Sequence, residues 1–216
     1  MSESVKNFWE KAHNENISLW LTGSGFNEVW KYLNILNLLS PNNNILNIGV
    51  GLGGETRELI KRNVIIDVLD ISETALERVK NITRNQYLSS NINNLPINEY
   101  DIVVSHLVTQ HMDNNGLNEQ IKYVLRSLKS EGVFAMQFAF IDNDQDTLIK
   151  LGKVYHHLSD VDVQLKGFMF RTLSEMNKIV EDNGGHISWI SEERKFDKTP
   201  IKWYYIHIKN KIYNEK

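Results

Sequence analysis

The segment Asn44-Ile-Leu-Asn-Ile-Gly-Val-Gly-Leu-Gly-Gly-Glu55 decides the fold of this chain. Residues with strand character run into a cluster of four glycines, and residues 56–62 then have helical character. Glycines that follow a buried strand let the backbone adopt positive φ and approach a ligand closely at the start of a helix. The segment therefore predicts a nucleotide-binding turn.

A second signal lies downstream, in the segment Val64-Ile-Ile-Asp-Val-Leu-Asp70. It has the composition of a buried strand and ends in an acid, 21 positions after Gly49. An acid at the end of the second strand can bind ribose hydroxyls, as in mononucleotide-binding βαβ units. The glycines and Asp70 together predict a nucleoside-containing ligand, which leaves a nicotinamide-dependent oxidoreductase as one alternative.

Composition limits the remaining possibilities. The chain has 216 residues, 41% of them hydrophobic and 24% charged, which is typical of one soluble globular domain. A net charge of -3 gives no electrostatic reason to expect nucleic acid or an anionic membrane as partner. The chain has no cysteine, no signal-peptide core and no apolar run approaching about 18 residues. We therefore expect a cytoplasmic protein, either a monomer or a homodimer.

Strands and helices are expected to alternate through the middle of the chain. Alternation of this kind predicts parallel strands with helices on both faces of the sheet. The expected strands are 45–48, 64–69, 86–88, 101–105 and 133–140, and the expected helices are 56–61, 72–81 and 116–129, with a tight turn at 130–132.

The end of the chain has a different pattern. Residues 172–183 are expected to form a helix, with Thr172 and Glu175 as a capping box. Residues 186–191 and 202–208 are expected to be two strands without an intervening helix, which predicts an antiparallel pair. Residues 142–170 are too long for a simple connection, and we interpret them as an insertion that serves function.

Residues 1–40 are expected to form a helical, aromatic-rich segment before the main domain, 41–216. Apolar residues recur at helical spacing in two stretches, first Val5, Phe8 and Trp9, then Val29, Trp30 and Leu33 within residues 26–36. One interpretation is a pair of helices that close one side of the core. The other is a lid over the ligand, with Trp20 and the turn at 22–25 near it.

Five short motifs, in order, resemble those of class I S-adenosylmethionine-dependent methyltransferases. They are Asn47-Ile-Gly-Val-Gly51-Leu-Gly53, Asp70-Ile-Ser72, Ser90-Asn-Ile92 before Leu95-Pro96, Asp101 to Ser105 with His111 beyond, and Leu128-Lys-Ser-Glu-Gly132. The resemblance spans residues 44–208. It implies an α/β fold with a Rossmann-like, doubly wound, seven-stranded sheet that is mostly parallel and has an antiparallel terminal strand.

The resemblance also implies S-adenosyl-L-methionine as the cofactor. The residues that match the family's binding motifs are Asn47, Gly49, Gly51, Asp70, Ile71, Asn91, Ile92 and Ser105. Asn47 and Asn91 depart from the family, which has acids at both positions. An asparagine keeps an acceptor oxygen but contributes no charge, so we expect either weaker binding of the cofactor or compensation by the N-terminal segment.

Two histidines are catalytic candidates. His106 directly follows the fourth strand, where relatives that methylate amines carry the Asn of an Asn-Pro-Pro-aromatic motif. That motif is absent here, which disfavours a DNA base or a glutamine amide as substrate. A histidine at this point can act as a general base toward an alcohol, or it can simply contact the cofactor. His111 matches a residue that is common in the family whatever the substrate, which favours a structural role.

Three residues are candidates for binding the substrate. Gln137, in the fifth strand, is expected to face the substrate crevice, and Tyr155 lies in the insertion. Arg171, after Phe168 and Phe170, could meet a phosphate or a carboxylate, although a packed loop is an equal alternative. The pair His156 and His157 could bind a metal, but adjacent residues diverge on a helix, so no metal site is predicted.

These observations predict a methyltransferase that acts on a small molecule. We expect methylation at oxygen, with a sugar or a surface-polysaccharide precursor as substrate. The alternatives are an N-methyltransferase of a small metabolite, a nicotinamide-dependent oxidoreductase and a cofactor-binding protein without catalysis. Neither nucleic acid nor a membrane is expected as partner.

Overall fold

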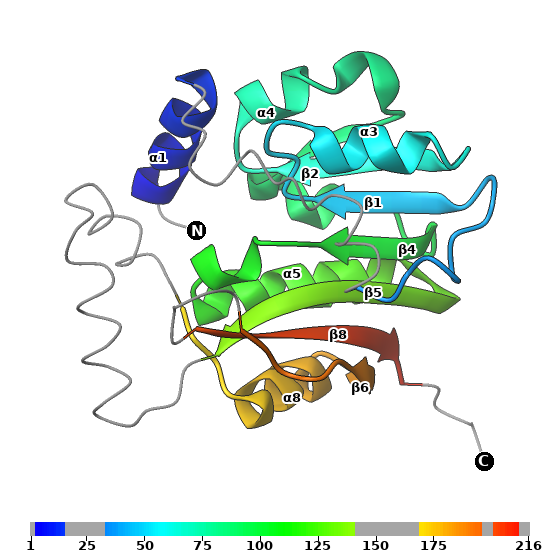
Figure 1. The fold of residues 1–216 in the computed structure, drawn as a ribbon, viewed down its shortest axis with the longest axis vertical. Helices are drawn as coiled ribbons and strands as arrows, with labels where there is room; N and C mark the ends of the chain where they lie inside the picture. Colours follow the sequence, from blue (N-terminus) through cyan, green and yellow to red (C-terminus); the bar gives the residue numbers. More distant parts are fainter. Residues whose placement is uncertain (1–2, 16–32, 141–168, 196–200, 212–216) are drawn as a thin grey trace.

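The computed structural model describes residues 3–15, 33–140, 169–195 and 201–211, which form a mixed sheet flanked by helices (Figure 1). The strands lie in the order β3-β2-β1-β4-β5-β8-β6. β1 to β5 pair in parallel, and β8 runs antiparallel to both β5 and β6. The strands are β1 (Asn44–Ile48), β2 (Ile65–Asp70), β3 (Gln86–Leu88), β4 (Tyr100–Ser105), β5 (Leu128–Phe140), β6 (Gly185–Ile190) and β8 (Lys202–Asn210). The predicted fold is therefore confirmed.

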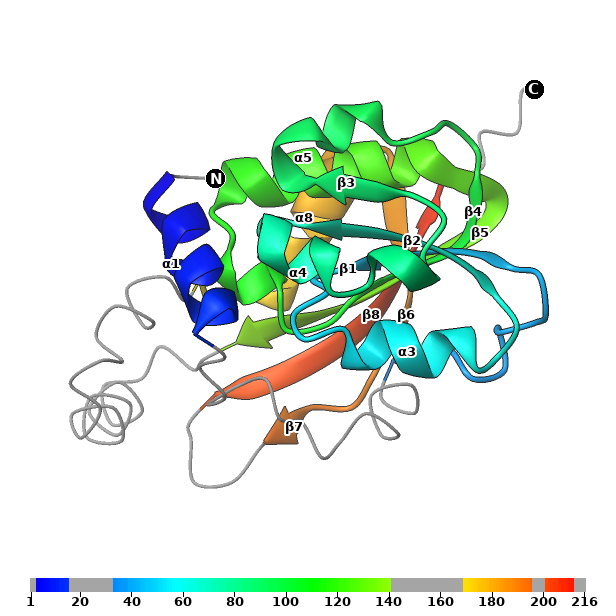
Figure 2. The same cartoon turned by 90° about the horizontal axis from the view of Figure 1, so that it is seen from above.

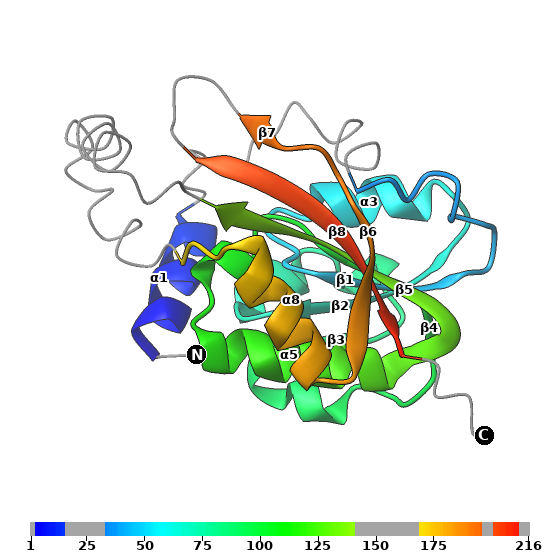
Figure 3. The same cartoon turned by 90° about the horizontal axis from the view of Figure 1, so that it is seen from below.

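The helices cover the two faces of this sheet. α5 (Asn114–Ser127) and α8 (Leu173–Asp182) lie on one face, and α3 (Gly54–Ile60) lies on the other (Figures 2 and 3). Successive side chains of a strand point to opposite faces. In β1, Leu46 and Ile48 accordingly join the core under α5 and α8, while Ile45 joins the core under α3 and α4 (Glu73–Glu77).

Helix caps explain where several elements begin. Ser72 caps α4 by accepting a hydrogen bond from the Ala75 backbone N–H. Thr172 and Glu175 form the predicted capping box at the start of α8. The helix expected over 72–81 divides into α4 and the 3₁₀ helix η1 (Lys80–Ile82). The remaining 3₁₀ helices are η2 (Ser89–Asn94), after β3, and η3 (Thr109–His111), after β4.

The tight turn predicted at 130–132 is wrong. Those residues lie inside β5, whose pairing with β4 jumps from Tyr100–Leu128 to Ile102–Val133. The surplus residues of β5 bulge out of register. A Cβ at Gly132 would lie 2.9 Å from the Tyr100 carbonyl oxygen, so glycine is the residue that lets the bulge lie against β4.

The N-terminal segment is helical only in part. α1 (Glu3–Asn14) confirms the first helical stretch. Residues 33–36 form turns, so the second helix is wrong over its described end. There Leu33 and Ile35 are buried against the sheet, and the Leu33 carbonyl oxygen lies 2.6 Å from His207 Nε2. Trp20, the 22–25 turn, Val29 and Trp30 lie outside the described residues.

The connection between β6 and β8 contains a short strand that was expected to be loop. β7 (Arg194–Lys195) pairs antiparallel with β8 and continues the edge that β6 forms (Figure 3). Among the described helices, none has the length and apolar character needed to cross a bilayer.

Candidate functional site

The glycine turn lies where β1 ends, at the sheet edge to which the parallel strands point (Figure 1). Gly49, Gly51 and Gly53 have φ of +84°, +56° and +79°. The Gly49 backbone N–H donates to the Leu69 carbonyl at 2.8 Å, which fixes the turn to β2. A Cβ at Gly49 would lie 2.2 Å from Val108 Cγ2. The turn therefore needs glycine both for its backbone angle and for the close approach of the chain after β4.

Replacing Gly49 with alanine is expected to destabilise the fold by about 1–3 kcal/mol, through a strained positive φ and the contact with Val108. The midpoint of urea unfolding measures this change. Gly184→Ala is the matched control, because Gly184 has a φ of +82° but no atom within 4 Å of the added Cβ. If both variants lost the same stability, the contact with Val108 would contribute nothing.

Asp70 lies directly beside the turn. Its Oδ1 accepts a hydrogen bond from the Ser72 backbone N–H at 2.9 Å, and its Oδ2 accepts one from the Gly51 backbone N–H at 3.3 Å. Burial raises the pKa of the Asp70 carboxyl, while these N–H groups and His13 act in the opposite direction. The structure thus brings Gly49, Gly51 and Asp70 together, as predicted for a ribose-binding edge. Ile71 follows Asp70 and is half-buried.

Two buried oxygens near this edge have no hydrogen-bond partner within the described structure. Asn47 donates from Nδ2 to Thr56 Oγ1 at 3.0 Å, but its Oδ1 is unpaired. Ser105 Oγ, at the end of β4, is unpaired as well, and both residues are fully buried. Leaving such atoms unpaired is costly, so a polar ligand that reaches them would be favoured. The glycine cradle, Asp70 and these two oxygens fit the predicted nucleoside cofactor.

Asn91 and Ile92 lie in η2, directly after β3. Asn91 is exposed and leaves the helical backbone conformation at φ −114° and ψ 25°. Ile92 is buried in the core together with Leu95. The cofactor role of both residues stays a prediction.

His106 is held by an acid that the motif analysis did not single out. Its Nδ1 lies 2.7 Å from Glu55 Oε1, and both side chains are nearly buried. An ionised carboxylate only accepts, so Nδ1 carries the hydrogen and Nε2 keeps the lone pair that can take a proton. The ring also stacks on Tyr205, with centroids 6.4 Å apart. The feature of the sequence that could have indicated Glu55 as a site residue is its position directly after the glycines.

Gln137 fixes the chain that follows His106. Its Oε1 accepts from the Leu107 backbone N–H at 3.0 Å, and its Nε2 donates to the Tyr205 hydroxyl at 3.4 Å. Leu107 has a φ of +57°, which the bond to Gln137 helps to hold. Gln137 is fully buried, so these contacts indicate a positioning role, and its binding of substrate stays a prediction.

His111 contacts an amide and an aromatic ring, with Gln110 Nε2 lying 3.3 Å from its Nε2. Trp9 of α1 meets it edge-on at 4.9 Å between centroids. Burial lowers the pKa of His111 to about 4, so the imidazole is neutral at physiological pH. The environment favours the structural role that the sequence suggested.

Arg171 is buried and binds the loop after β4. It donates to the carbonyl oxygens of Thr109 at 3.2 Å and Met112 at 2.5 Å, and to Asn114 Oδ1 at 3.1 Å. These contacts give no support to a substrate role. Tyr155, His156, His157 and Phe168 lie outside the described residues. Within the described ranges, no three metal-ligating side chains gather closely enough to hold an ion.

The sequence matches one family model. Residues 46–136 match the model described as a methyltransferase domain, a range that includes the glycine turn, Asp70 and His106. No curated protein matches the sequence.

The fold is similar to that of 1014 solved chains. One is 1,6-didemethyltoxoflavin-N1-methyltransferase from Burkholderia thailandensis, with a TM-score of 0.70, 10% identity, and coverage of 96% of this chain and 88% of that one. Phosphoethanolamine N-methyltransferase 2 from Haemonchus contortus gives 0.72 and 17%, with coverage of 97% and 61%. Magnesium protoporphyrin IX methyltransferase from Synechocystis gives 0.65 and 14%, with coverage of 95% and 100%. Similarity at such low identity shows a shared fold.

Proposed function

Because the family match and the fold identify this chain as a class I S-adenosylmethionine-dependent methyltransferase, we propose that it methylates a hydroxyl oxygen of a small molecule. The same match removes the nicotinamide-dependent oxidoreductase from the alternatives. The proposal rests on one observation, the contact of Glu55 with His106 directly after β4. The carboxyl ends of β4 and β5 are where substrates meet the cofactor in a doubly wound sheet.

The proposed reaction needs a base at that position. When bound, S-adenosylmethionine supplies a methyl group on a positively charged sulfur. His106 Nε2 would accept the hydroxyl proton of the substrate, whose oxygen would take the methyl group with loss of its bond to the cofactor sulfur. Glu55 holds the imidazole in the proton-accepting tautomer and stabilises the imidazolium that forms. The chain thus needs no other proton acceptor.

The cofactor would be held by groups on both sides of β1. The positive-φ backbone of the glycine turn and the Asp70 carboxylate would lie against the nucleoside part. Asn47 Oδ1 and Ser105 Oγ are the buried acceptors that remain to be paired. Asn91 and Ile92 would complete the adenine side.

A second candidate is methylation at nitrogen of a small metabolite. It is favoured by the names of the relatives from Burkholderia thailandensis and Haemonchus contortus, which are N-methyltransferases. A base also serves that reaction when the amine is protonated. Hydroxylated metabolites, among them sugar and surface-polysaccharide precursors, are the first acceptors to compare with amines.

Binding of S-adenosylhomocysteine, measured by titration calorimetry, tests the cofactor part of the proposal. Asp70→Asn is expected to weaken binding by about 10–100-fold, since hydrogen bonds to a charged group contribute about 1.5–3 kcal/mol. Asp182→Asn, on the exposed side of α8, is the control and should bind like the wild type. A wild-type chain that does not bind S-adenosylhomocysteine would refute the proposed function. Binding without methylation of any hydroxyl or amine acceptor would favour the non-catalytic alternative.

A further inference from the structure

α1 contacts two segments of the chain, one that follows β2 and one that follows β4 (Figures 1 and 2). On one side it contacts α4, which follows β2. On the other side Trp9 contacts His111, which follows β4. β1 lies between β2 and β4 in the sheet, so α1 spans the end of β1, where the glycine turn begins.

The attachment of α1 to α4 is built from several polar contacts. The Thr74 backbone N–H and hydroxyl both donate to Glu10 Oε1, the former at 3.2 Å. Arg78 donates to the His13 carbonyl oxygen at 2.7 Å, and the Lys6 ammonium lies 3.6 Å from Glu73. These contacts fix the rotation of α1, so that the same face of the helix always meets the β2 end.

His13 is the buried polar residue on that face. Its side chain is only 3% exposed, and its ring lies beside Trp9 with centroids 5.9 Å apart. Its Nδ1 is buried and has no hydrogen-bond partner in the described part of the chain. The charged groups that act on it are Asp70, Arg78 and Glu10, with Asp70 the strongest of the three.

A histidine packed against a tryptophan needs no ligand to explain it. An unpaired Nδ1 does need explanation, because a buried polar atom without a partner costs about 1–3 kcal/mol. Asp70 is the acid placed to accept hydrogen bonds from a ribose diol. Its carboxylate accepts from Ser72, the residue before α4, and α4 carries the contacts of Thr74 and Arg78 to α1. Each hydroxyl of a diol can donate one hydrogen bond and accept others. A ribose bound to Asp70 would therefore offer its hydroxyls on the side of α1 that carries His13.

We propose that His13 is a cofactor-binding residue whose Nδ1 forms a hydrogen bond with one ribose hydroxyl of the nucleoside held by Asp70. This inference rests on the proposed function, because it takes S-adenosylmethionine as the ligand. It assigns the N-terminal helix a direct part in the binding site. It also explains how a chain with Asn47 and Asn91 in place of two acids gains a further polar contact to the cofactor.

Calorimetry with S-adenosylhomocysteine and its 2′-deoxy and 3′-deoxy analogues tests the contact. His13→Ala is expected to weaken binding of S-adenosylhomocysteine by about 2–13-fold, the range of one net hydrogen bond. For the analogue that lacks the contacted hydroxyl, wild type and variant should bind equally. His13→Asn, whose amide can replace Nδ1, should recover part of the affinity, and Lys11→Ala, exposed on α1, should have no effect.

The outcomes separate this inference from the proposed function. If His13→Ala binds S-adenosylhomocysteine like the wild type, the inference is wrong and the methyltransferase assignment stands. An equal loss of affinity for all three ligands also refutes it, because it would indicate that His13 only supports α1. A wild-type chain that binds none of the three ligands refutes both.

Discussion

Replacing His106 with glutamine is expected to lower kcat by about 10²–10⁴-fold, the usual contribution of a general base. Glutamine keeps the approximate size and polarity of the side chain but accepts no proton from a hydroxyl. Binding of S-adenosylhomocysteine should stay within a few-fold of wild type, because the base acts on the acceptor. The measurement is transfer of a labelled methyl group from S-adenosylmethionine to hydroxylated acceptors, followed by steady-state kinetics on the best one.

Glu55→Gln separates positioning from proton transfer. The Glu55 carboxylate only accepts, so it fixes Nδ1 as the donor, whereas an amide can donate and would permit the unproductive tautomer. We expect a smaller loss of kcat than in His106→Gln, with little change in KM.

His111→Ala is the comparison for His106. The His111 ring is buried beside Trp9, and its pKa of about 4 leaves it without charge across the working range. Its removal should affect stability more than kcat. Full activity of His106→Gln on a hydroxyl acceptor would show that His106 is not the general base. Loss of activity in His111→Ala with an unchanged unfolding midpoint would transfer the role to His111.

Local features of this fold follow directly from short spacings in the sequence. The Ser72 cap, the Thr172–Glu175 capping box and the glycine turn each involve residues within a few positions of one another. Their geometry is set by the backbone between them, so the residue types alone predict them. The strand that ends in Asp70 could likewise be predicted from residues that are adjacent in the sequence.

The contacts that define the candidate site depend on tertiary packing. Glu55 and His106 are 51 positions apart and meet only because α3 and the end of β4 converge. Gln137 was expected to face the substrate crevice, and Arg171 either to meet a substrate or to belong to a packed loop. Both bind backbone groups of the loop after β4. A sequence shows where a polar side chain occurs, but it does not show which distant backbone group will be its hydrogen-bond partner. For the same reason the bulge at Gly132 was taken for a turn.

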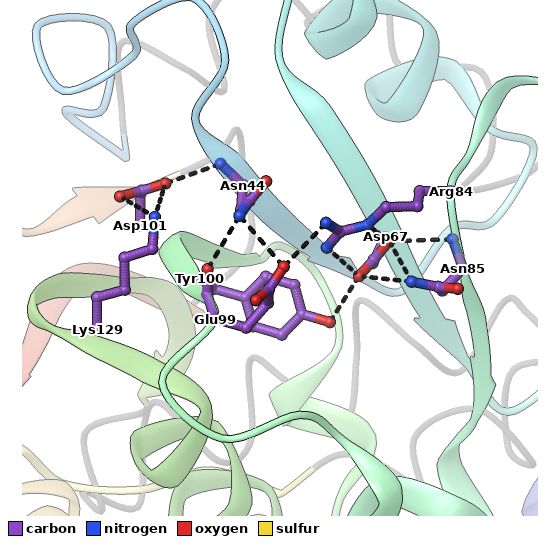
Figure 4. A network of polar contacts seen from close by, with 8 residues as sticks. All are labelled: Asn44, Asp67, Arg84, Asn85, Glu99, Tyr100, Asp101 and Lys129. Carbon is purple, nitrogen blue, oxygen red and sulfur yellow. Dashed lines mark hydrogen bonds and ion pairs between the residues drawn. The ribbon is translucent and has the colours of Figure 1, made fainter.

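The other edge of the sheet carries a polar network with a different purpose (Figure 4). Asp67, in β2, is fully buried and accepts hydrogen bonds from Arg84 Nε at 2.9 Å and Nη2 at 2.7 Å. It also accepts from the Asn85 backbone N–H at 3.0 Å and the Tyr100 hydroxyl at 2.9 Å. Arg84 also forms an ion pair with Glu99, with 2.8 Å between Nη1 and Oε1. The network ties β2 to β4 and to the segment before β3, away from the carboxyl ends of the parallel strands.

Asp67→Ala is therefore expected to destabilise the protein by about 2–5 kcal/mol, because two hydrogen-bond donors lose their acceptor, each at a cost of about 1–3 kcal/mol where it is buried. The buried Tyr100 hydroxyl and the Asn85 N–H would lose their acceptor, while the half-exposed Arg84 could still reach water. Against a total stability of roughly 5–15 kcal/mol, this loss is large. Urea unfolding, compared at equal slope, gives the change.

Two further variants make the test decisive even if Asp67→Ala folds poorly. Asp67→Asn keeps the shape and should cost less than alanine, because its Oδ1 still accepts. In a double-mutant cycle, Tyr100→Phe should cost less in the Asp67→Ala background than in wild type, because its partner is already gone. Asp101→Asn, at the half-exposed ion pair with Lys129, should cost about 1 kcal/mol or less. If substitution of Asp67 and of Asp101 cost the same stability, burial would not be what makes the Asp67 carboxylate important. If the effects of Asp67→Ala and Tyr100→Phe were additive, Tyr100 and Asp67 would act independently.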